Sequence, residues 1–240
     1  MLLIAMKLVE GFRIDNFIIL TFNIYISIIV HMANREFFVD YLVELFPDAR
    51  CELEFSSNFE LLIAVMLSAQ CNDKRVNLVT KELFKTLNKP QDFVDVSLEK
   101  LEEIIKPCGL YKSKAKHIKE CCKSLVENFN GQVPSDHKKL TSLSGVGNKT
   151  ANVVCATAFN QNCIAVDTHV LRVSNRLGFT KSSNPDICER DLTRKFKTNL
   201  SKLHHRMVLF GRYYCKARNP ECNNCKLKDE CMYYKQKVKR

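Results

Sequence analysis

The stretch LSGVGNKTA, residues 143–151, decides the fold of this chain. Gly145 and Gly147 lack a Cβ atom, so the backbone can turn sharply there and another surface can approach it closely. A short helical pattern that Ser135 would cap precedes this turn, ending near Leu143, and a longer apolar pattern begins after it at Ala151. Together they predict a helix-hairpin-helix over residues 135–158.

The turn of this hairpin leads directly into a helix N-terminus. Unpaired N–H groups and the positive end of the helix dipole predict a site for a phosphate group, bound without reading a base sequence. The alternative is an ordinary corner between two helices. Lys149 lies in the first helical turn, where the dipole disfavours a cation and so favours the neutral, nucleophilic amine. The alternative for Lys149 is a surface lysine beside a DNA-binding loop.

Apolar residues recur at intervals of three and four along the chain from Met32 onward, which predicts an all-α fold. Ser57 and Glu60 form the pattern of a capping box, and the apolar residues after them cover nearly every face, as in a core helix. A second helix has an apolar stripe and ends at Asn130-Gly131. The stripe consists of Ala115, Ile118, Cys122, Leu125 and Phe129.

Asp167 precedes another helical pattern, which Gly178 would end. The simplest interpretation of Asp167 is a helix cap. Only its occurrence together with Lys149 suggests a chemical role.

Composition favours a polyanionic partner. The 240 residues include 37 Lys and Arg against 26 Asp and Glu, a formal net charge of +11, which makes nucleic acid the first candidate. Solvated basic tails, such as residues 235–240, are the alternative explanation. Four of the twelve cysteines cluster near the C-terminus and eight are scattered, which is typical of a cytosolic protein without disulfides.

Residues 17–30 form an apolar run that is too short to span a membrane and is not followed by a small-x-small cleavage site. We therefore expect neither a membrane role nor export. Because a polar, amphipathic sequence begins at Met32, we expect translation to start there and residues 1–31 to be an extension outside the fold.

The C-terminal cysteines, Cys215, Cys222, Cys225 and Cys231, have the spacing C-x6-C-x2-C-x5-C. Four thiolates within 17 residues predict a metal centre. Zinc and a 4Fe-4S cluster both accept four cysteines, and the spacing alone leaves the metal open. The loop after the first cysteine carries Lys216 and Arg218, which suit contact with phosphate, although a solvated charged loop is the alternative.

The hairpin with Lys149, the segment at residues 166–169 and the cysteine array occur in an order and spacing that resemble the endonuclease III family. The resemblance covers residues from about 51 to 234, with further matches at residues 67–70, 109–111 and 211–213. It implies a 4Fe-4S cluster rather than zinc. It also implies two helical lobes with a DNA-binding cleft between them: a six-helix barrel at residues 51–161, and a cluster domain of residues 32–50 plus 162–240.

The resemblance implies a base-excision-repair enzyme that binds double-stranded DNA. Such an enzyme removes oxidised or ring-saturated pyrimidines and cleaves 3′ of the abasic site. Lys149 would attack the sugar and form a Schiff base, with Asp167 assisting. Gln70 and Leu110 would enter the duplex where the damaged nucleotide is extruded. For Gln70 the alternative is a polar helix end, and for Leu110 the core. We expect a monomer that is cytoplasmic and DNA-associated.

Two other functions compete with this one. An adenine-specific mismatch glycosylase shares the hairpin, the aspartate and the cluster, but generally lacks the hairpin lysine and has a further C-terminal domain. A catalytically silent DNA-binding module would need only the hairpin and the basic loop. The presence of Lys149 argues against the first, and the presence of both Lys149 and Asp167 argues against the second. No role is assigned to His169, and His204 and His205 are interpreted as packing or solvated positions.

Overall fold

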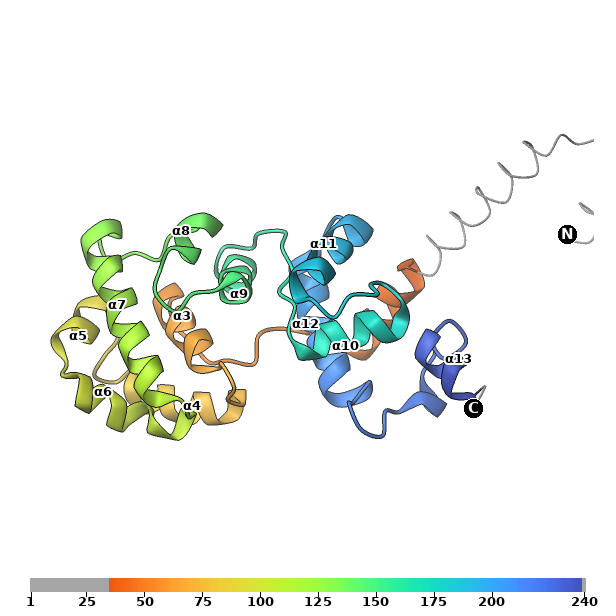
Figure 1. Cartoon of the computed structure of the whole chain (residues 1–240), viewed down its shortest axis with the longest axis horizontal. Coiled ribbons are helices and arrows are strands. Elements are labelled where there is room, and N and C mark those ends of the chain that lie inside the picture. The colour runs from red at the N-terminus through yellow and green to blue at the C-terminus, as the bar shows by residue number, and fades with distance from the viewer. Residues whose placement is uncertain (1–34, 239–240) are drawn as a thin grey trace, which may run out of the picture.

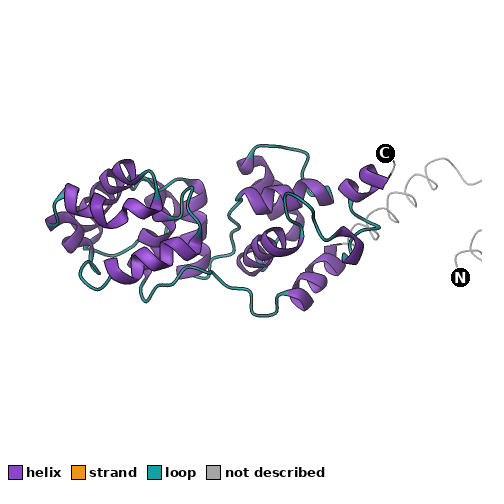
Figure 2. Cartoon of the chain, turned by 90° about the horizontal axis from the view of Figure 1, so that it is seen from below, coloured by secondary structure: helices purple, strands orange, loops and turns teal. Residues whose placement is uncertain are grey.

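The computed structural model describes residues 35–238, and this range contains helices, turns and loops but no strand (Figure 2). The predicted all-α class is confirmed for this part of the chain. The predicted extension at residues 1–31 and the expected start at Met32 lie outside the described residues. Between residues 35 and 238, no helix is long and apolar enough to cross a membrane.

The helices form two lobes along the long axis of the molecule (Figure 1). The first lobe contains α3 (Asn58–Leu67), α4 (Asp73–Leu83), α5 (Pro90–Asp95), α6 (Leu98–Ile105), η1 (Lys106–Cys108), α7 (Tyr111–Phe129), α8 (His137–Thr141) and α9 (Asn148–Ala158). The second lobe contains a helix at residues 35–45, α10 (Thr168–Leu177), α11 (Pro185–Phe196), α12 (Leu200–Leu209), η2 (Phe210–Tyr214), η3 (Cys222–Asn224) and α13 (Met232–Val238). Each lobe has its own apolar core.

Helix α3 is the core helix of the first lobe. Its N-cap Ser57 accepts a hydrogen bond from the Glu60 backbone N–H at 3.1 Å, as predicted. In the predicted capping box, the Glu60 carboxylate would accept a hydrogen bond from the backbone N–H of Ser57. It accepts instead from the backbone N–H of Ser56, one residue earlier, at 2.6 Å. Every residue from Phe59 to Leu67 is buried, which confirms the predicted core helix.

Helix α7 has the predicted apolar stripe and the predicted end. Asn130 caps it in the left-handed conformation, with φ of 50°, and the Gly131 N–H donates to the Leu125 carbonyl oxygen at 2.8 Å. One face of α7 is buried in the first core, and the lysines of the opposite face are exposed to solvent.

Helices α8 and α9 form the predicted hairpin, but the cap of α8 differs from the prediction. Asp136, not Ser135, is the N-cap, and its carboxylate accepts from the Lys139 backbone N–H at 2.9 Å. A carboxylate suits this position because it meets the positive end of the helix dipole. Ser135 instead uses its carbonyl oxygen to accept a hydrogen bond from the Gln161 side chain at 2.7 Å.

The core of the second lobe joins both ends of the described chain. Phe38, from the helix at residues 35–45, is fully buried with its ring centroid 4.8 Å from that of Phe179 and 5.9 Å from that of Phe196. This packing supports the predicted association of residues 32–50 with residues 162–240. The domain boundaries themselves stay a prediction.

Residues 164–166 form the seam between the two lobes. Ile164 and Val166 belong to the second core, whereas Ala165 between them belongs to the first. This alternation is typical of an extended chain, whose successive side chains point to opposite sides. Asp167 follows directly, so the seam places this carboxylate at the junction of the lobes.

A cluster of polar side chains also ties the lobes together. Arg212 of η2 pairs with Asp73, at the start of α4, at 2.9 Å, and also with Glu52. The Tyr213 hydroxyl donates to Glu52 at 2.9 Å. The charged groups are only partly exposed, so solvent screens these contacts less than ordinary surface pairs.

Candidate active site

Lys149 occupies the predicted position in the first turn of α9, and it is exposed. Gly147 is the N-cap of this helix and has no side chain to accept from the first-turn N–H groups. Those N–H groups have no partner within a regular helix, so they are available to an external acceptor such as a phosphate oxygen.

The two hairpin glycines are needed for different reasons. Gly145 has φ of +75°, and a Cβ there would lie 2.8 Å from the His117 Cβ, so both its conformation and its packing require glycine. Gly147 has an ordinary φ of −84°, and a Cβ there would meet no described atom within 4 Å. The chain itself therefore tolerates a side chain at Gly147, and the space beside it is open to another molecule.

Asp167 is the N-cap of α10, as predicted. Its Oδ1 accepts from the Val170 backbone N–H at 2.7 Å. Its other carboxylate oxygen makes no hydrogen bond to any residue in the range 35–238, and the side chain is half-buried. One oxygen thus holds the carboxylate in place, while the other can face a substrate.

The charges of Lys149 and Asp167 both affect the pKa of His204, a residue of α12. The ring is buried, and its Nδ1 donates to the Ala165 carbonyl oxygen of the seam at 2.9 Å. Burial lowers the pKa of His204, the negative charge of Asp167 opposes this effect, and the positive charge of Lys149 adds to it. The charges of both predicted catalytic residues therefore act on one buried ring, although the two residues belong to different helices.

The prediction that His204 is a packing residue is correct as far as it goes. What the sequence did not indicate is that the charges of both catalytic candidates affect the pKa of this ring. The only available signal was the double histidine at 204–205, which does not show which charged groups act on it.

His205 leads to a prediction about stability and pH. Burial, with a smaller contribution from His204, lowers the pKa of His205 to about 4, while an unfolded histidine has a pKa of 6.5. Above pH 6.5 the ring is neutral in both the folded and the unfolded chain, so its burial contributes fully to the free energy of unfolding. As the pH falls from 6.5 towards 4, protonation favours the unfolded chain, and the contribution is lost.

We therefore expect His205→Gln to lose less free energy of unfolding than the wild type between pH 7 and pH 4.5. Urea unfolding at several pH values in this window measures the difference. Parallel curves for the two proteins would show that His205 does not titrate in this way.

Asn148, the residue before Lys149, connects the hairpin to the second lobe. Its side-chain amide donates to Asp186 at 3.0 Å and to Glu189 at 2.9 Å, both on α11. These contacts fix the start of α9 against the other lobe, and with it the position of Lys149. Sequence reasoning assigned no role to Asn148, because its partners are 38 and 41 residues further along the chain.

Gln70 and Leu110 lie on two loops of the first lobe in the left-handed conformation, with φ of 55° and 48°. For a residue with a Cβ this conformation costs about 1–2 kcal/mol. Leu110 is 56% exposed, so the alternative of a core position is wrong. Gln70 is also exposed, just after α3. Both side chains are available to a partner outside the protein.

The four C-terminal cysteines, Cys215, Cys222, Cys225 and Cys231, line one pocket that is partly open to solvent. Burial raises the pKa of Cys225 to about 11 and also raises that of Cys231, so these thiols keep their protons unless a metal displaces them. No group of three or more His, Cys, Asp or Glu side chains within residues 35–238 is arranged to hold a single metal ion.

Two arginines of α10 bind the loop that begins at the first of these cysteines. Arg172 Nε donates to the Cys215 carbonyl oxygen at 3.1 Å, and Arg176 Nη1 donates to the Lys216 carbonyl oxygen at 2.7 Å. Arg176 also lies 3.3 Å from the Cys215 Sγ and stacks over the Tyr233 ring at 4.3 Å. The helix capped by the candidate carboxylate is therefore anchored to the cysteine loop.

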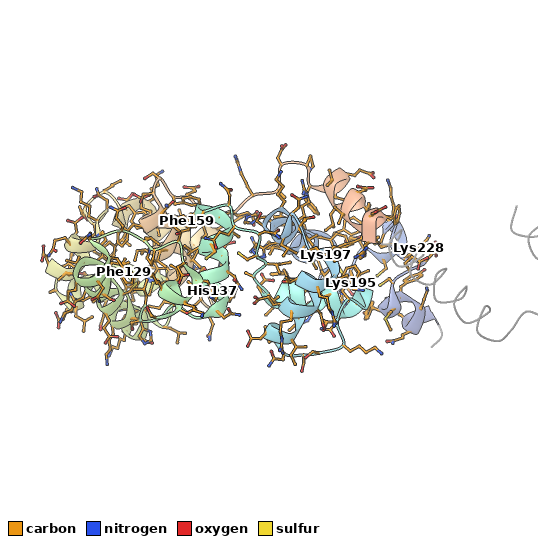
Figure 3. All side chains as sticks on the ribbon, turned by 90° about the horizontal axis from the view of Figure 1, so that it is seen from above. Phe129, His137, Phe159, Lys195, Lys197 and Lys228 are labelled. Atoms are coloured by element: carbon orange, nitrogen blue, oxygen red, sulfur yellow. The ribbon has the colours of Figure 1, made fainter. Side chains whose placement is uncertain are left out.

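The predicted basic loop is only partly free. Lys216 Nζ pairs with Glu221 Oε1 at 2.6 Å, which offsets its charge, whereas Arg218 is exposed. Three further lysines, Lys195, Lys197 and Lys228, lie in the second lobe (Figure 3). The other residues labelled there, Phe129, His137 and Phe159, lie in the first lobe.

Comparison with known proteins agrees with this geometry. A family profile described as "HhH-GPD superfamily base excision DNA repair protein" matches residues 63–198. Endonuclease III of Bacillus subtilis (strain 168) is 47% identical over 204 residues, which cover 84% of this chain and 93% of the relative. The chain belongs to the endonuclease III family. The predicted resemblance is thereby confirmed, and so is the prediction of a base-excision-repair enzyme with DNA glycosylase activity.

Two solved structures of endonuclease III have the same fold. The "Structure of a Trapped Endonuclease III-DNA Covalent Intermediate: Estranged-Adenine Complex" matches with a TM-score of 0.82 and 46% identity, covering 85% of this chain and 98% of that one. The "Structure of a non-covalent Endonuclease III-DNA Complex" matches with a TM-score of 0.82 and 47% identity, covering 85% and 97%. The two-lobed helical arrangement is therefore that of this family.

Proposed function

We propose that this member of the endonuclease III family is both a DNA glycosylase and an abasic-site lyase. It would remove oxidised or ring-saturated pyrimidines from double-stranded DNA and then cleave the strand 3′ of the abasic site. The proposal rests on the family membership and on the positions of two residues: Lys149 in the first turn of α9, and Asp167 as the N-cap of α10 directly after the seam between the lobes. A nucleophile on one lobe and a carboxylate at the junction with the other suit attack on a sugar carbon.

In the proposed reaction, the neutral amine of Lys149 attacks the sugar C1′. The bond from C1′ to the base breaks, its electron pair leaves with the protonated base, and the amine loses a proton to give an aminal. The C1′–O4′ bond of the sugar ring then breaks, O4′ takes up a proton, and the nitrogen lone pair forms the protonated Schiff base. The Schiff base makes the C2′ proton acidic, and removal of that proton expels the 3′ phosphate by β-elimination. Asp167 would stabilise the positive charge that develops on the sugar and help to deprotonate the amine.

The hairpin and the two exposed loops would bind the DNA. The N–H groups at the start of α9 would hold a phosphate, and Gly147 leaves room for the DNA backbone to approach. Leu110 and Gln70 would fill the space that the extruded nucleotide leaves in the duplex. The related solved structures named above are described as complexes of endonuclease III with DNA, which supports double-stranded DNA as the partner.

The four C-terminal cysteines would hold a 4Fe-4S cluster. Their thiols line one pocket, and their spacing is similar to that of the endonuclease III family, which supports a 4Fe-4S cluster over zinc. When bound, the cluster supplies metal–thiolate bonds that crosslink residues 215–231. Those bonds would hold the loop of Lys216 and Arg218 in place. A cytoplasmic location and a monomeric state stay predictions.

One set of duplexes tests the proposed activity. We expect strand cleavage of duplexes with thymine glycol or an abasic site, and little cleavage of duplexes with uracil or an A·G mismatch. Release of adenine from the mismatch would indicate the adenine-specific alternative. Binding without cleavage of any duplex would indicate a silent DNA-binding module.

A further inference from the structure

The two loops proposed to enter the duplex follow different helices, but the backbone at the start of each contacts the same buried side chain. The loop of Gln70 follows α3, and the loop of Leu110 follows η1. Neither residue is a glycine, yet both adopt the left-handed conformation. Such a conformation persists only where the surrounding structure holds it in place.

Lys114 of α7 joins the backbones of these two loops. It is 7% exposed, and its Nζ donates to the Leu67 carbonyl oxygen at 2.8 Å and to the Cys108 carbonyl oxygen at 2.9 Å. Leu67 is the last residue of α3, three residues before Gln70. Cys108 is the last residue of η1, two residues before Leu110. One ammonium group thus spans the starting points of both loops.

The chemistry around this ammonium group shows why a lysine suits the position. The last carbonyl groups of a helix have no partner within it, so a buried cation can satisfy two of them at once. Burial lowers the pKa of Lys114. Burial also raises the pKa of the neighbouring Cys108 to about 11, so this thiol stays neutral. The carbonyl dipoles, not a thiolate, therefore hold the charge.

We propose that Lys114 is a positioning residue that sets the two DNA-inserting loops at the separation and angle that the extrusion of a nucleotide requires. It does not contact the reacting atoms. The inference rests on the proposed roles of Gln70 and Leu110. Without the two hydrogen bonds of Lys114, each loop could relax separately. Leu110 would then still be present but misplaced, and a small misplacement can greatly lower the rate of base release.

Lys119 provides a matched control on the same helix. It is partly buried, and its Nζ donates to the carbonyl oxygens of Phe93 at 3.0 Å, of Val94 at 2.9 Å and of Val96. It therefore also holds backbone carbonyl groups, in this case at the end of α5, which lies on the outer side of the first lobe, away from the second (Figure 1). Replacing it should cost stability without touching the inserting loops.

The test uses the full chain and a duplex with a non-hydrolysable abasic analogue opposite 2-aminopurine, whose fluorescence rises when it loses its stacking. We expect Lys114→Met to reduce the fluorescence rise and to slow base release from a thymine glycol duplex at saturating enzyme, the latter by about tenfold or more. Affinity for undamaged duplex, measured in the same salt, should change little. Lys119→Met should match the loss of thermal stability but keep wild-type fluorescence and rate.

Two further variants make the outcome decisive. Lys114→Gln can donate to one carbonyl group but cannot span both, so it should fall between the wild type and Lys114→Met, and it decides the question if the methionine variant does not fold. Wild-type insertion and base release in a folded Lys114 variant, or equal losses in Lys119→Met, would overturn the proposal. Leu110→Ala in the same assay tests the wedge itself. If it keeps the full fluorescence rise, the assigned role of Leu110 fails instead.

Discussion

Lys149→Gln is expected to abolish covalent trapping on DNA. Borohydride reduces a Schiff base to a stable amine, so the wild type should become fixed to duplexes that contain thymine glycol or an abasic site. The amide of glutamine keeps hydrogen bonding but cannot form the Schiff base. Trapping should fall by roughly three orders of magnitude or more, as for the loss of other covalent nucleophiles. Gel electrophoresis of the reduced adduct measures it.

Binding should survive in the same variant. The hairpin N–H groups belong to the backbone of α9, and Arg218 and the inserting loops are unchanged, so the affinity for a damaged duplex should stay close to wild type. A reduced adduct at the wild-type level in Lys149→Gln would mean that another amine is the nucleophile. The proposed mechanism would then be wrong, although the family membership would stand.

Asp167→Asn distinguishes the two catalytic candidates. An abasic site already presents an aldehyde, whereas an intact glycosidic bond requires stabilisation of positive charge on the sugar. Base release should therefore fall by roughly 10²–10³-fold, and cleavage of a pre-formed abasic site by much less. Because asparagine is also a good N-cap, α10 should keep its start at Thr168. Equal losses on both substrates would argue for a structural role of Asp167.

The second large effect is expected for Cys222→Ser. We expect the purified wild type to be brown and to contain about four irons and little zinc per chain. The serine variant should lose most of its iron, because one of the four thiols that line the pocket is gone. Without the crosslink, the loop of Lys216 and Arg218 should lose its fixed shape. DNA affinity should then fall more than the rate of trapping at saturating DNA.

Cys188→Ala is the matched control for this variant. Cys188 is fully buried in the core of the second lobe but does not line the cysteine pocket, so its loss should lower stability without removing iron. Iron and zinc analysis, visible absorption and DNA titration measure these differences. Colourless wild-type protein with one zinc per chain would contradict the cluster, and unchanged affinity of Cys222→Ser would contradict the role of the loop.

The structure also bears on two expectations about individual side chains. Lys216 pairs with Glu221 at 2.6 Å, so Arg218 is the more accessible cation of the loop, and the contact of the loop with phosphate stays a prediction. Ser135 was expected to cap α8, but Asp136 does so. Ser135 and Asp136 are adjacent and both chemically able to cap a helix, and the sequence does not rank them.

Local features of this protein could be read from the sequence alone. The caps at Ser57, Asn130 and Asp167 were predicted correctly, because a cap is a hydrogen bond between a residue and a backbone group only a few positions away. The hairpin turn and the four-cysteine array are equally local. Their order along the chain was also enough to identify the family.

The assembly of the site was decided only by the tertiary structure. His204 reaches the Ala165 carbonyl group across 39 residues, Asn148 reaches Glu189 across 41, and Lys114 reaches Leu67 across 47. The periodicity of a helix shows which face is buried but not which residue of another helix it meets. The contacts of His204 and Asn148 depend on how the lobes pack at residues 164–166, whereas that of Lys114 depends on how α7 packs against α3. The charges of Lys149 and Asp167, from separate helices, both affect the pKa of this buried histidine.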